Sequence, residues 1–406
     1  MRGTSRFGTV APALLTLAAA EAGRRLLSPP PPPVEPVRVD LSAYFSGAEI
    51  DRGRHFARPQ RALGLARGAI ELGALALVVA RPPALLRRPW RRPVRAGAAA
   101  AAGLSAALSL PTLPLRAVAR RRSMAIGLDT QTWRAWGEDL VKASVLQAGF
   151  AAAAGAVVVA ATRRYPRAWW LPAAAGSVGA GALLAALAPV LLDPIFNDFQ
   201  PLPEGETRAD VLALARDAGV RVGEVYSVDA SRRTTAANAY VTGMGPTKRV
   251  VLFDTLLDRY SRDEIRLVVA HELGHVRHRD VARQVLFAAI VAPGTALAVQ
   301  RLSWALSPER GTAAALPGLA LAAALISAPV GIVASALSRA VVRRADHFSL
   351  ELAGAPEAFV SFERTIALQN VADLDPPRWV TRLVASHPPT AERIGAAVAF
   401  AQAQPA

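Results

Sequence analysis

The chain has 406 residues, of which 52% are hydrophobic, and it carries a formal net charge of +16 with a mean hydropathy of +0.27. It contains no cysteine, so disulfides and thiolate metal ligands are excluded, and any bound metal must rest on histidine and carboxylate side chains. The arginines cluster beside long apolar runs and lack the interleaved aromatic residues of single-strand binders. The positive charge therefore favours a membrane protein over a nucleic-acid-binding one.

Seven apolar stretches are each long enough for a helix that crosses a bilayer, which needs about 20 residues. They lie near 8–27, 62–80, 96–115, 144–162, 168–192, 284–305 and 312–338. The first could instead be a signal peptide, because Arg2 and Arg6 precede its apolar centre and small residues follow at 18–20. Buried helices of a soluble protein are a further alternative, which seven such blocks in one chain disfavour. We expect a multi-pass protein of the cell membrane, in contact with the lipid bilayer.

The loops between these stretches differ in composition. The proline run at 29–33 cannot be helical and predicts a stiff, extended connector. Arginines gather in 52–61, 81–95 and 116–122. Because consecutive loops lie on opposite sides of a membrane, these arginines do not fix the orientation of the chain.

Residues 193–281 change in character and predict a small α+β domain. The segment 193–205 is rich in turn residues, and 206–220 has a helical period that ends at a glycine. The segments 221–231, 235–245 and 247–257 are typical of short strands separated by glycine turns. In the next helix, Ser261 and Glu264 form a capping box, and we expect this helix to continue through 263–280.

The segment HELGH at 271–275 carries the chemistry of the chain. His271 and His275 are four residues apart, so both imidazoles project from one helix face and can converge on a metal ion at about 2.0–2.1 Å. Glu272 lies beside the first ligand, where it can take a proton from a metal-activated water and pass it to the leaving amine. Gly274 lets another backbone approach closely. The pattern predicts a zinc peptidase site.

A less specific interpretation of this segment is an amphipathic helix with two surface histidines, because HExxH fixes only three positions. The helix cap, the apolar LVVA before the motif and the apolar stretch after it favour the metal site. His278 rises beyond the ion along the helix axis, so we interpret it as a polar residue at the helix end.

Five segments in order resemble the integral-membrane zinc metalloproteases related to CAAX prenyl protease type 1, and the more distant heat-shock membrane metalloproteases share the core motifs. The segments are DPIFNDFQPLPEG, NAYVTGMGPTKRVVLFDTLL, HELGHVRHRD, SRAVVRRAD and SHPPTAERI. The resemblance covers roughly residues 40 to 400. It implies seven transmembrane helices around a large chamber and a zinc site that faces inward. It also implies cleavage of peptide bonds, in some members beside a prenylated C-terminal cysteine.

The resemblance implies roles for particular residues. His271 and His275 match zinc ligands of the family, and Glu272 matches its catalytic base. His387, in SHPP, matches a histidine that steadies the transition state, and Asn238, in NAYV, matches an asparagine on the strand that binds substrate by edge pairing. Ordinary turn positions are the alternatives for His387 and Asn238. We expect AANAYV to be an edge strand with one open side, next to the metal helix.

The segment SRAVVRRAD departs from the family pattern. The family's third ligand is a glutamate in an ExxAD sequence, and here Val342 occupies its position while Ala345 and Asp346 are in place. Three interpretations stay open. Asp346 replaces the glutamate as a ligand instead of orienting a ligand histidine, or zinc binds weakly to two histidines and water, or the protein is an inactive relative. We expect Val342 to face the two histidines, with no carboxylate in the third ligand position.

The sequence thus predicts a mainly α, polytopic membrane metalloendopeptidase that binds one Zn²⁺ and cleaves a peptide or protein substrate. Its expected parts are 1–192 as an N-terminal transmembrane region of about five helices, 193–281 as the catalytic HExxH domain, 282–338 as two transmembrane helices, and 339–406 as the C-terminal part of the catalytic domain. The alternative is a catalytically impaired relative that binds peptides or acts as a scaffold. A small-molecule transporter is disfavoured, because the polar residues gather in a domain with a protease motif. We expect no nucleic-acid partner, and no oligomeric state is predicted.

Overall fold

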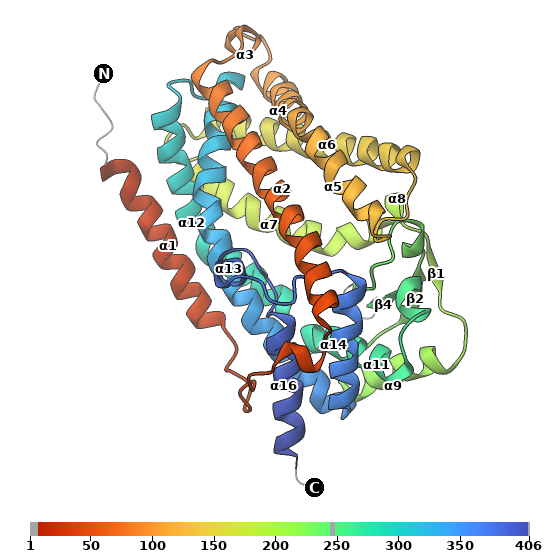
Figure 1. Ribbon diagram of the computed structural model, residues 1–406. Coiled ribbons are helices and arrows are strands. Elements are labelled where there is room, and N and C mark those ends of the chain that lie inside the picture. The colour runs from red at the N-terminus through yellow and green to blue at the C-terminus, as the bar shows by residue number, and fades with distance from the viewer. Residues whose placement is uncertain (1–6, 244–247, 405–406) are drawn as a thin grey trace.

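Six helical spans make up the membrane part of the computed structural model, which describes residues 7–243 and 248–404 (Figure 1). Each is long and apolar enough to cross a bilayer. They are α2 (Gly47–Ala80), α4 (Pro93–Ser109) with its continuation through η2 (Leu110–Thr112) into α5 (Leu113–Ala125), α6 (Trp133–Arg164), α7 (Trp170–Leu191), α12 (Asp280–Leu306) and α13 (Leu316–Ala353). The predicted mainly helical, polytopic architecture is confirmed.

The first expected span forms another helix, α1 (Phe7–Leu27), which packs along α12 and α13. Its last turns carry Glu21, Arg24 and Arg25, and α1 is not one of the six spans found in the described residues. The sequence predicts about seven membrane spans. The structure confirms six of them, and the first forms α1, a less apolar helix that packs beside the others. Arg2 and Arg6, on which the signal-peptide alternative rests, lie outside the described residues.

Helices of the bundle approach closely where small residues meet. A Cβ added to Gly155 of α6 would lie 2.6 Å from the carbonyl oxygen of Gly97 in α4, so only glycine fits this crossing. α13 does not stop where the apolar stretch ends near residue 338. It continues as one helix to Ala353, where Gly354 turns the chain with a φ of 62°. The same rigid helix therefore spans the membrane and enters the polar domain.

A four-stranded sheet lies at one end of the bundle, and the short helix α3 (Ala84–Arg87) marks the other end (Figure 1). The strand order is β1 (Phe199–Pro201), β2 (Glu224–Val228), β4 (Arg249–Phe253) and β3 (Ala239–Thr242). β2 and β4 are parallel, and both outer strands pair antiparallel to their neighbours. The three predicted strands are confirmed as β2, β3 and β4, whereas β1 forms inside the segment expected only to turn. The glycine turn expected after β3 lies partly at 244–247, outside the described residues.

Short helices cover the sheet and complete the polar domain. The core beneath them contains Val225, Val250 and Leu252 of the sheet and Val269 and Leu273 of α11, all fully buried. The helical elements of this domain are α8 (Asp193–Phe196), α9 (Glu206–Asp217), η3 (Ala230–Arg232), α10 (Asp254–Leu257), α11 (Arg262–Arg277), α14 (Pro356–Gln369), α15 (Arg378–Leu383) and α16 (Thr390–Ala403). Of these, α15 and α16 pack on α13 and α14. Burial of this apolar face fixes α11 against the sheet.

The metal helix α11 starts as predicted and ends earlier than predicted. Ser261 and Glu264 make both hydrogen bonds of the capping box. The prediction of a continuous helix through 280 is wrong, because α11 ends at Arg277 with His278 as its C-cap. Arg279 then adopts a left-handed φ of 56°, and α12 begins at Asp280. This turn brings Asp280 back toward the face of α11 that carries the histidines.

The proline-rich connector is not helical, as expected, and bends at residues 33–34 before it reaches the C-terminal helix. η1 (Leu41–Ala43) follows it and leads to α2. The N–H of Val37 donates to the carbonyl oxygen of Gly395 in α16 at 3.2 Å, and a Cβ on Gly395 would lie 2.1 Å from the Val37 carbonyl oxygen. A glycine is thus required where the connector crosses α16.

Candidate active site

The two histidines of α11 meet through their Nε2 atoms, which are 3.2 Å apart. Two nitrogens bound to one tetrahedral zinc at about 2.0–2.1 Å are themselves about 3.3 Å apart, so this separation fits a single shared ion. His271 is 8% exposed, and His275 is half-buried. The predicted arrangement of both imidazoles on one face of the helix is present, and the pair offers two nitrogen donors to a metal.

Each imidazole has a carboxylate at its other nitrogen. Asp346 Oδ1 of α13 lies 2.8 Å from His271 Nδ1, and Asp280 Oδ2 of α12 lies 2.9 Å from His275 Nδ1. Carboxylates in this position hold the imidazole proton on Nδ1, orient the ring and leave the Nε2 lone pair for a metal. When both rings are neutral with their protons on Nδ1, their Nε2 lone pairs face each other, and a cation between them would offset the repulsion.

The two carboxylates are themselves held by arginines from other helices. Arg393 of α16 donates to Asp346 through two hydrogen bonds, at 2.9 and 2.6 Å, and also contacts Glu363 of α14. Arg344 of α13 donates to Asp280. The bidentate Arg393–Asp346 pair has a fixed geometry and so fixes the carboxylate beside His271. The carboxylate beside His275 is restrained by the single hydrogen bond from Arg344.

The surroundings of the site shift the pKa values of His275 and Glu363. Burial would lower the pKa of His275, but the Asp280 hydrogen bond and the charge of Glu272 outweigh it and raise that pKa above its usual value. Glu363 is fully buried, and this desolvation raises the pKa of its carboxyl to about 7, although Arg393 acts in the opposite direction.

No carboxylate of α13 completes the metal site. Val342 lies one helical turn before Asp346 on the same face of α13 and is 2% exposed. Asp346 lies at Nδ1 of His271, away from the paired Nε2 atoms, so it orients a ligand and does not replace the glutamate. Within 7–243 and 248–404, no three His, Cys, Asp or Glu side chains gather closely enough to hold a metal ion together. The residues therefore fit a zinc ion with two of the three protein donors in the family pattern.

The close crossing of α11 and α13 explains Gly274. A Cβ at this position would lie 3.0 Å from Phe348 Cδ1 and 3.5 Å from Ala345 Cα. The expectation that this glycine admits another backbone is confirmed. His278, one turn later, caps the helix and stacks edge-on against the Phe348 ring at a centroid distance of 5.4 Å. It is a helix-end residue, as expected.

Glu272 faces a cavity of about 690 Å³ together with His275. One wall consists of Val241, Thr242 and Gly243 at the end of β3, and apolar residues of α7 and α12 form another. The lining also includes charged residues, Lys248, Arg279 and Asp280. This volume is in the usual range for a ligand pocket. A peptide in the cavity would lie between the metal helix and the sheet edge, with membrane helices on the far side.

His387 lies in the loop between α15 and α16, near the same group of charges. Its Nδ1 is 2.9 Å from Ser386 Oγ, which leaves Nε2 for another partner. Desolvation and the positive charges of Arg393 and His271 lower the pKa of His387, which favours the neutral ring at pH 7. Arg339 of α13 donates to the Ala385 carbonyl oxygen at 2.5 Å and so holds this loop to the metal-site helix.

Asn238 immediately precedes β3 and is exposed. β3 pairs only with β4 among the described residues and contacts α11, so the predicted edge strand beside the metal helix is confirmed. The Phe253 N–H donates to the Asn238 carbonyl oxygen at 3.1 Å. Because bonding alternates along an antiparallel ladder, the N–H groups of Ala239 and Val241 point to the open side.

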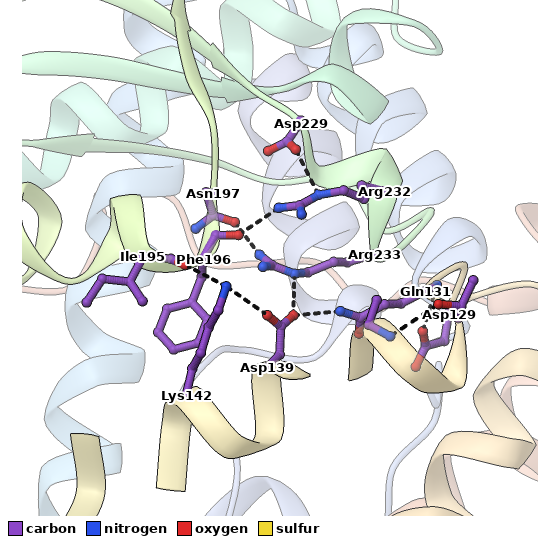
Figure 2. A network of polar contacts seen from close by, with 12 residues as sticks. Asp129, Gln131, Asp139, Lys142, Ile195, Phe196, Asn197, Asp229, Arg232 and Arg233 are labelled. Carbon is purple, nitrogen blue, oxygen red and sulfur yellow. Dashed lines mark hydrogen bonds and ion pairs between the residues drawn. The ribbon is translucent and has the colours of Figure 1, made fainter. Parts of the chain in front are cut away.

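A polar network fixes the loop that leads into β3 (Figure 2). Arg233 donates to Asp139 of α6 at 3.0 Å and to Asn197 at 2.6 Å, and Gln131 donates to Asp139 at 2.6 Å. Arg232 also donates to the Phe196 carbonyl oxygen at 2.9 Å. The position of the edge strand is therefore tied to a membrane helix.

The sequence alone did not reveal the ion pairs that hold the two histidines and their carboxylates in place. Asp280, Arg344, Arg393 and Glu363 come from four different helices, α12, α13, α16 and α14. The sequence signals for these residues are the charged positions of HRD, SRAVVRRAD and SHPPTAERI, none of which shows its partner.

Comparisons with known proteins bear on this site and fold. The family model for peptidase family M48 matches residues 201–401. The chain is 32% identical over 300 residues to an uncharacterized metalloprotease, YhfN, of Bacillus subtilis, covering 72% of this chain and 70% of that protein. It is 41% identical over 106 residues to CAAX prenyl protease 1 of Saccharomyces cerevisiae, covering 26% of this chain and 23% of that protein. The crystal structure of Ste24p from S. mikatae superposes with a TM-score of 0.77 at 21% identity and covers 96% of this chain and 97% of the other.

Proposed function

Because this chain belongs to peptidase family M48 and is a multi-pass membrane metalloprotease, we propose that it binds one zinc ion through His271 and His275 and cleaves peptides in the cavity beside β3. The observation that carries the proposal is the 3.2 Å separation of two Nε2 atoms whose rings are each oriented by a carboxylate. The alternative of a non-enzymatic scaffold is not favoured by these family relationships.

A zinc ion held by His271 and His275 would supply Lewis acidity, which lowers the pKa of a bound water to about 7 and polarises a carbonyl group. Glu272 takes the proton from the attacking water and delivers it to the amide nitrogen that leaves, so the proton is conserved. His387 donates a hydrogen bond from Nε2–H to the carbonyl oxygen as negative charge develops there. Ser386 supports this tautomer when its hydroxyl donates to Nδ1.

The substrate strand pairs with the open edge of β3. The outward N–H and carbonyl of Val241 bond to the peptide backbone, and Asn238 binds at the start of the same edge. Backbone pairing fixes the direction of the peptide without reading its sequence. The apolar walls from α7 and α12 then favour apolar side chains near the scissile bond.

The proposal also assigns the parts of the chain. Residues 1–192 and 282–338 form the membrane region, and 193–281 with 339–406 form one catalytic unit. The contacts of α11 with α13 and α14 support the grouping of 193–281 with 339–406.

Zinc content and cleavage of the purified protein in detergent test the proposal. We expect one zinc per chain by elemental analysis, and cleavage of a quenched fluorescent peptide that a chelator removes and added zinc restores. His275→Ala should lose both zinc and cleavage. His55→Ala, an exposed histidine on α2, is the matched control and should change neither. Zinc-free protein that cleaves the peptide with or without chelator would contradict the proposal.

A further inference from the structure

The end of the bundle far from the active site carries many arginines that form no ion pair within the described residues. We call it the distal end and define it as residues 81–95, 163–170 and 301–313, which contain one acidic residue, Glu309. Arg163 and Gly311 are in contact there, since a Cβ on Gly311 would lie 3.0 Å from Arg163 Cγ. In 7–243 and 248–404, no carboxylate lies within 4.0 Å of the following side chains: Arg81, Arg87, Arg88, Arg91, Arg92, Arg95, Arg163, Arg164, Arg167 and Arg310. This end therefore presents uncompensated positive charge.

Aromatic residues place the distal end at the boundary between lipid and water. Trp90 and Tyr165 are each 47% exposed, and the Arg310 guanidinium lies 4.4 Å from the centroid of the Trp304 ring. Tryptophan and tyrosine gather at the headgroup level of membranes. The exposed arginines of this end thus lie where phospholipid phosphates are found.

A groove of about 470 Å³ opens at the distal end, and we call it the distal groove. Its apolar walls are Leu85 and Leu86 from α3, the Trp90 ring, and small residues of α4. A Cβ added to Gly103 would meet no heavy atom within 4 Å, so the deep part of the groove is open. From Arg95 to Gly103 the groove follows α4 for about 12 Å, which carries it from the interface into the hydrocarbon region.

Two arginines stand at the mouth of the distal groove, at the start of α4. Arg92 is the N-cap residue and makes no side-chain capping bond, and Arg95 lies in the first turn. Positive side chains are unfavourable at a helix N-terminus, where the free N–H groups already favour an anion. A bound anion would satisfy the helix end and both arginines at once.

We propose that the distal groove binds one anionic phospholipid of the bilayer. Its phosphate lies between Arg92 and Arg95 at the N-terminus of α4, and one acyl chain follows α4 past Ala96 and Ala99 to Gly103. A zwitterionic lipid fits less well, because no acidic side chain lines the groove to pair with its ammonium group. The apolar walls require an acyl chain, so free phosphate binds only weakly.

Lipid binding to the delipidated full-length protein in detergent tests this site, with native mass spectrometry as the readout. Phosphatidylglycerol, phosphatidylcholine and inorganic phosphate are titrated separately. Wild type should bind one phosphatidylglycerol more tightly than phosphatidylcholine and should retain no phosphate. Arg92→Gln with Arg95→Gln should weaken phosphatidylglycerol roughly 30-fold, because each arginine near an anionic surface contributes about a fivefold factor.

Two further variants separate the possible causes. Arg216→Gln with Arg221→Gln removes the same charge from exposed positions on the polar domain and should leave lipid binding unchanged. Gly103→Leu keeps every arginine but fills the open groove, and it should lose the bound lipid even if the double arginine variant fails to fold. Equal phosphatidylglycerol affinity in wild type and Gly103→Leu, or equal retention of phosphate and phospholipid, would overturn the proposal.

Discussion

The two helices that cross at the metal site contribute to it unequally. α11 supplies both histidines and the glutamate beside them, whereas α13 supplies Asp346 and Arg344, which orient the histidines, and a valine at the position of the third ligand. The groups that orient the two histidines are therefore present, whereas no third donor of the expected pattern lies with them among the described residues. Orientation and ligation are separable in this site, because the orienting carboxylates are held by arginines and do not depend on the third donor.

Replacement of Glu272 by Gln should have the largest effect, because it removes the proton carrier that α11 provides. We expect peptide cleavage to fall by about 10³-fold, in the range of general acid–base catalysis. Zinc content should stay at the wild-type level, since Glu272 is not one of the paired histidines. Cleavage assays and elemental analysis of the same preparation measure both quantities. If zinc were lost along with activity, the division between metal ligands and proton carrier on α11 would be wrong.

Val342→Glu should restore on α13 the third ligand that the family pattern has at this position. The new carboxylate supplies a third donor, so we expect zinc affinity to rise by at least about 100-fold, more than an orienting residue contributes. Peptide cleavage should rise with it. Without zinc the buried charge is uncompensated, so the variant should be less stable than wild type in chelator and more stable with zinc.

Val342→Gln is the matched control, because it has the same shape without the charge. Competition titration with a zinc chelator and thermal melts with and without zinc measure the two effects. A wild type that already holds one tight zinc, with no change in either quantity for Val342→Glu, would show that another donor completes the site.

The α11 side was predictable from the sequence because its information is local. The spacing of His271 and His275 and the capping box fix a helix face whatever the rest of the chain does. The edge position of β3 follows in the same way from its short length and the turn after it. The end of α11 was not predictable, because its charged residues suit a continuing helix and only the left-handed Arg279 reveals the break.

The part of the site that α13 provides could not be predicted, because it depends on contacts between segments that are distant in the sequence. Nothing in the local sequence shows that Arg393 lies between Asp346 and Glu363, or that Asp280 turns back to His275. These pairings depend on how four helices pack against one another. A single sequence does not show which residues of those helices face each other. β1 was missed for a related reason: three residues that include a proline are too short a signal without the partner strand.

Asp280→Asn and Asp346→Asn compare the two orienting carboxylates directly. Each change keeps the size of the side chain and removes the charge that holds the imidazole proton on Nδ1. We expect zinc affinity to fall about 10- to 100-fold in either variant, the usual effect of such a partner. Chelator titration measures this, and kcat at saturating zinc should recover if the role is orientation alone. A kcat that stays low at saturating zinc would mean that the carboxylate acts in the reaction itself.

Val241→Pro tests the open edge of β3 without touching the metal. Proline removes the outward N–H and leaves the bonds to β4, because those come from the alternate residues. Loss of one backbone hydrogen bond of about 0.5–1.5 kcal/mol should raise KM roughly 3- to 10-fold. Val241→Ala keeps the N–H and is the control. Equal KM values for the two variants, measured in steady-state peptide cleavage, would exclude peptide pairing at this edge.

The smallest expected effect concerns Glu363, which shares Arg393 with Asp346. Burial raises the pKa of its carboxyl from 4.5 to about 7, so the folded protein keeps a proton that the unfolded chain releases within this pH window. The protonated Glu363 carboxyl therefore makes its full contribution to the free energy of unfolding below about pH 4.5. This contribution, about 1–3 kcal/mol, is lost as the pH rises through 7. Glu363→Gln cannot ionise, so its free energy of unfolding relative to wild type should improve between pH 5 and pH 8. Denaturant titrations at both pH values measure the difference. An unchanged difference would mean that Glu363 stays ionised beside Arg393, and this single guanidinium would then hold two carboxylates.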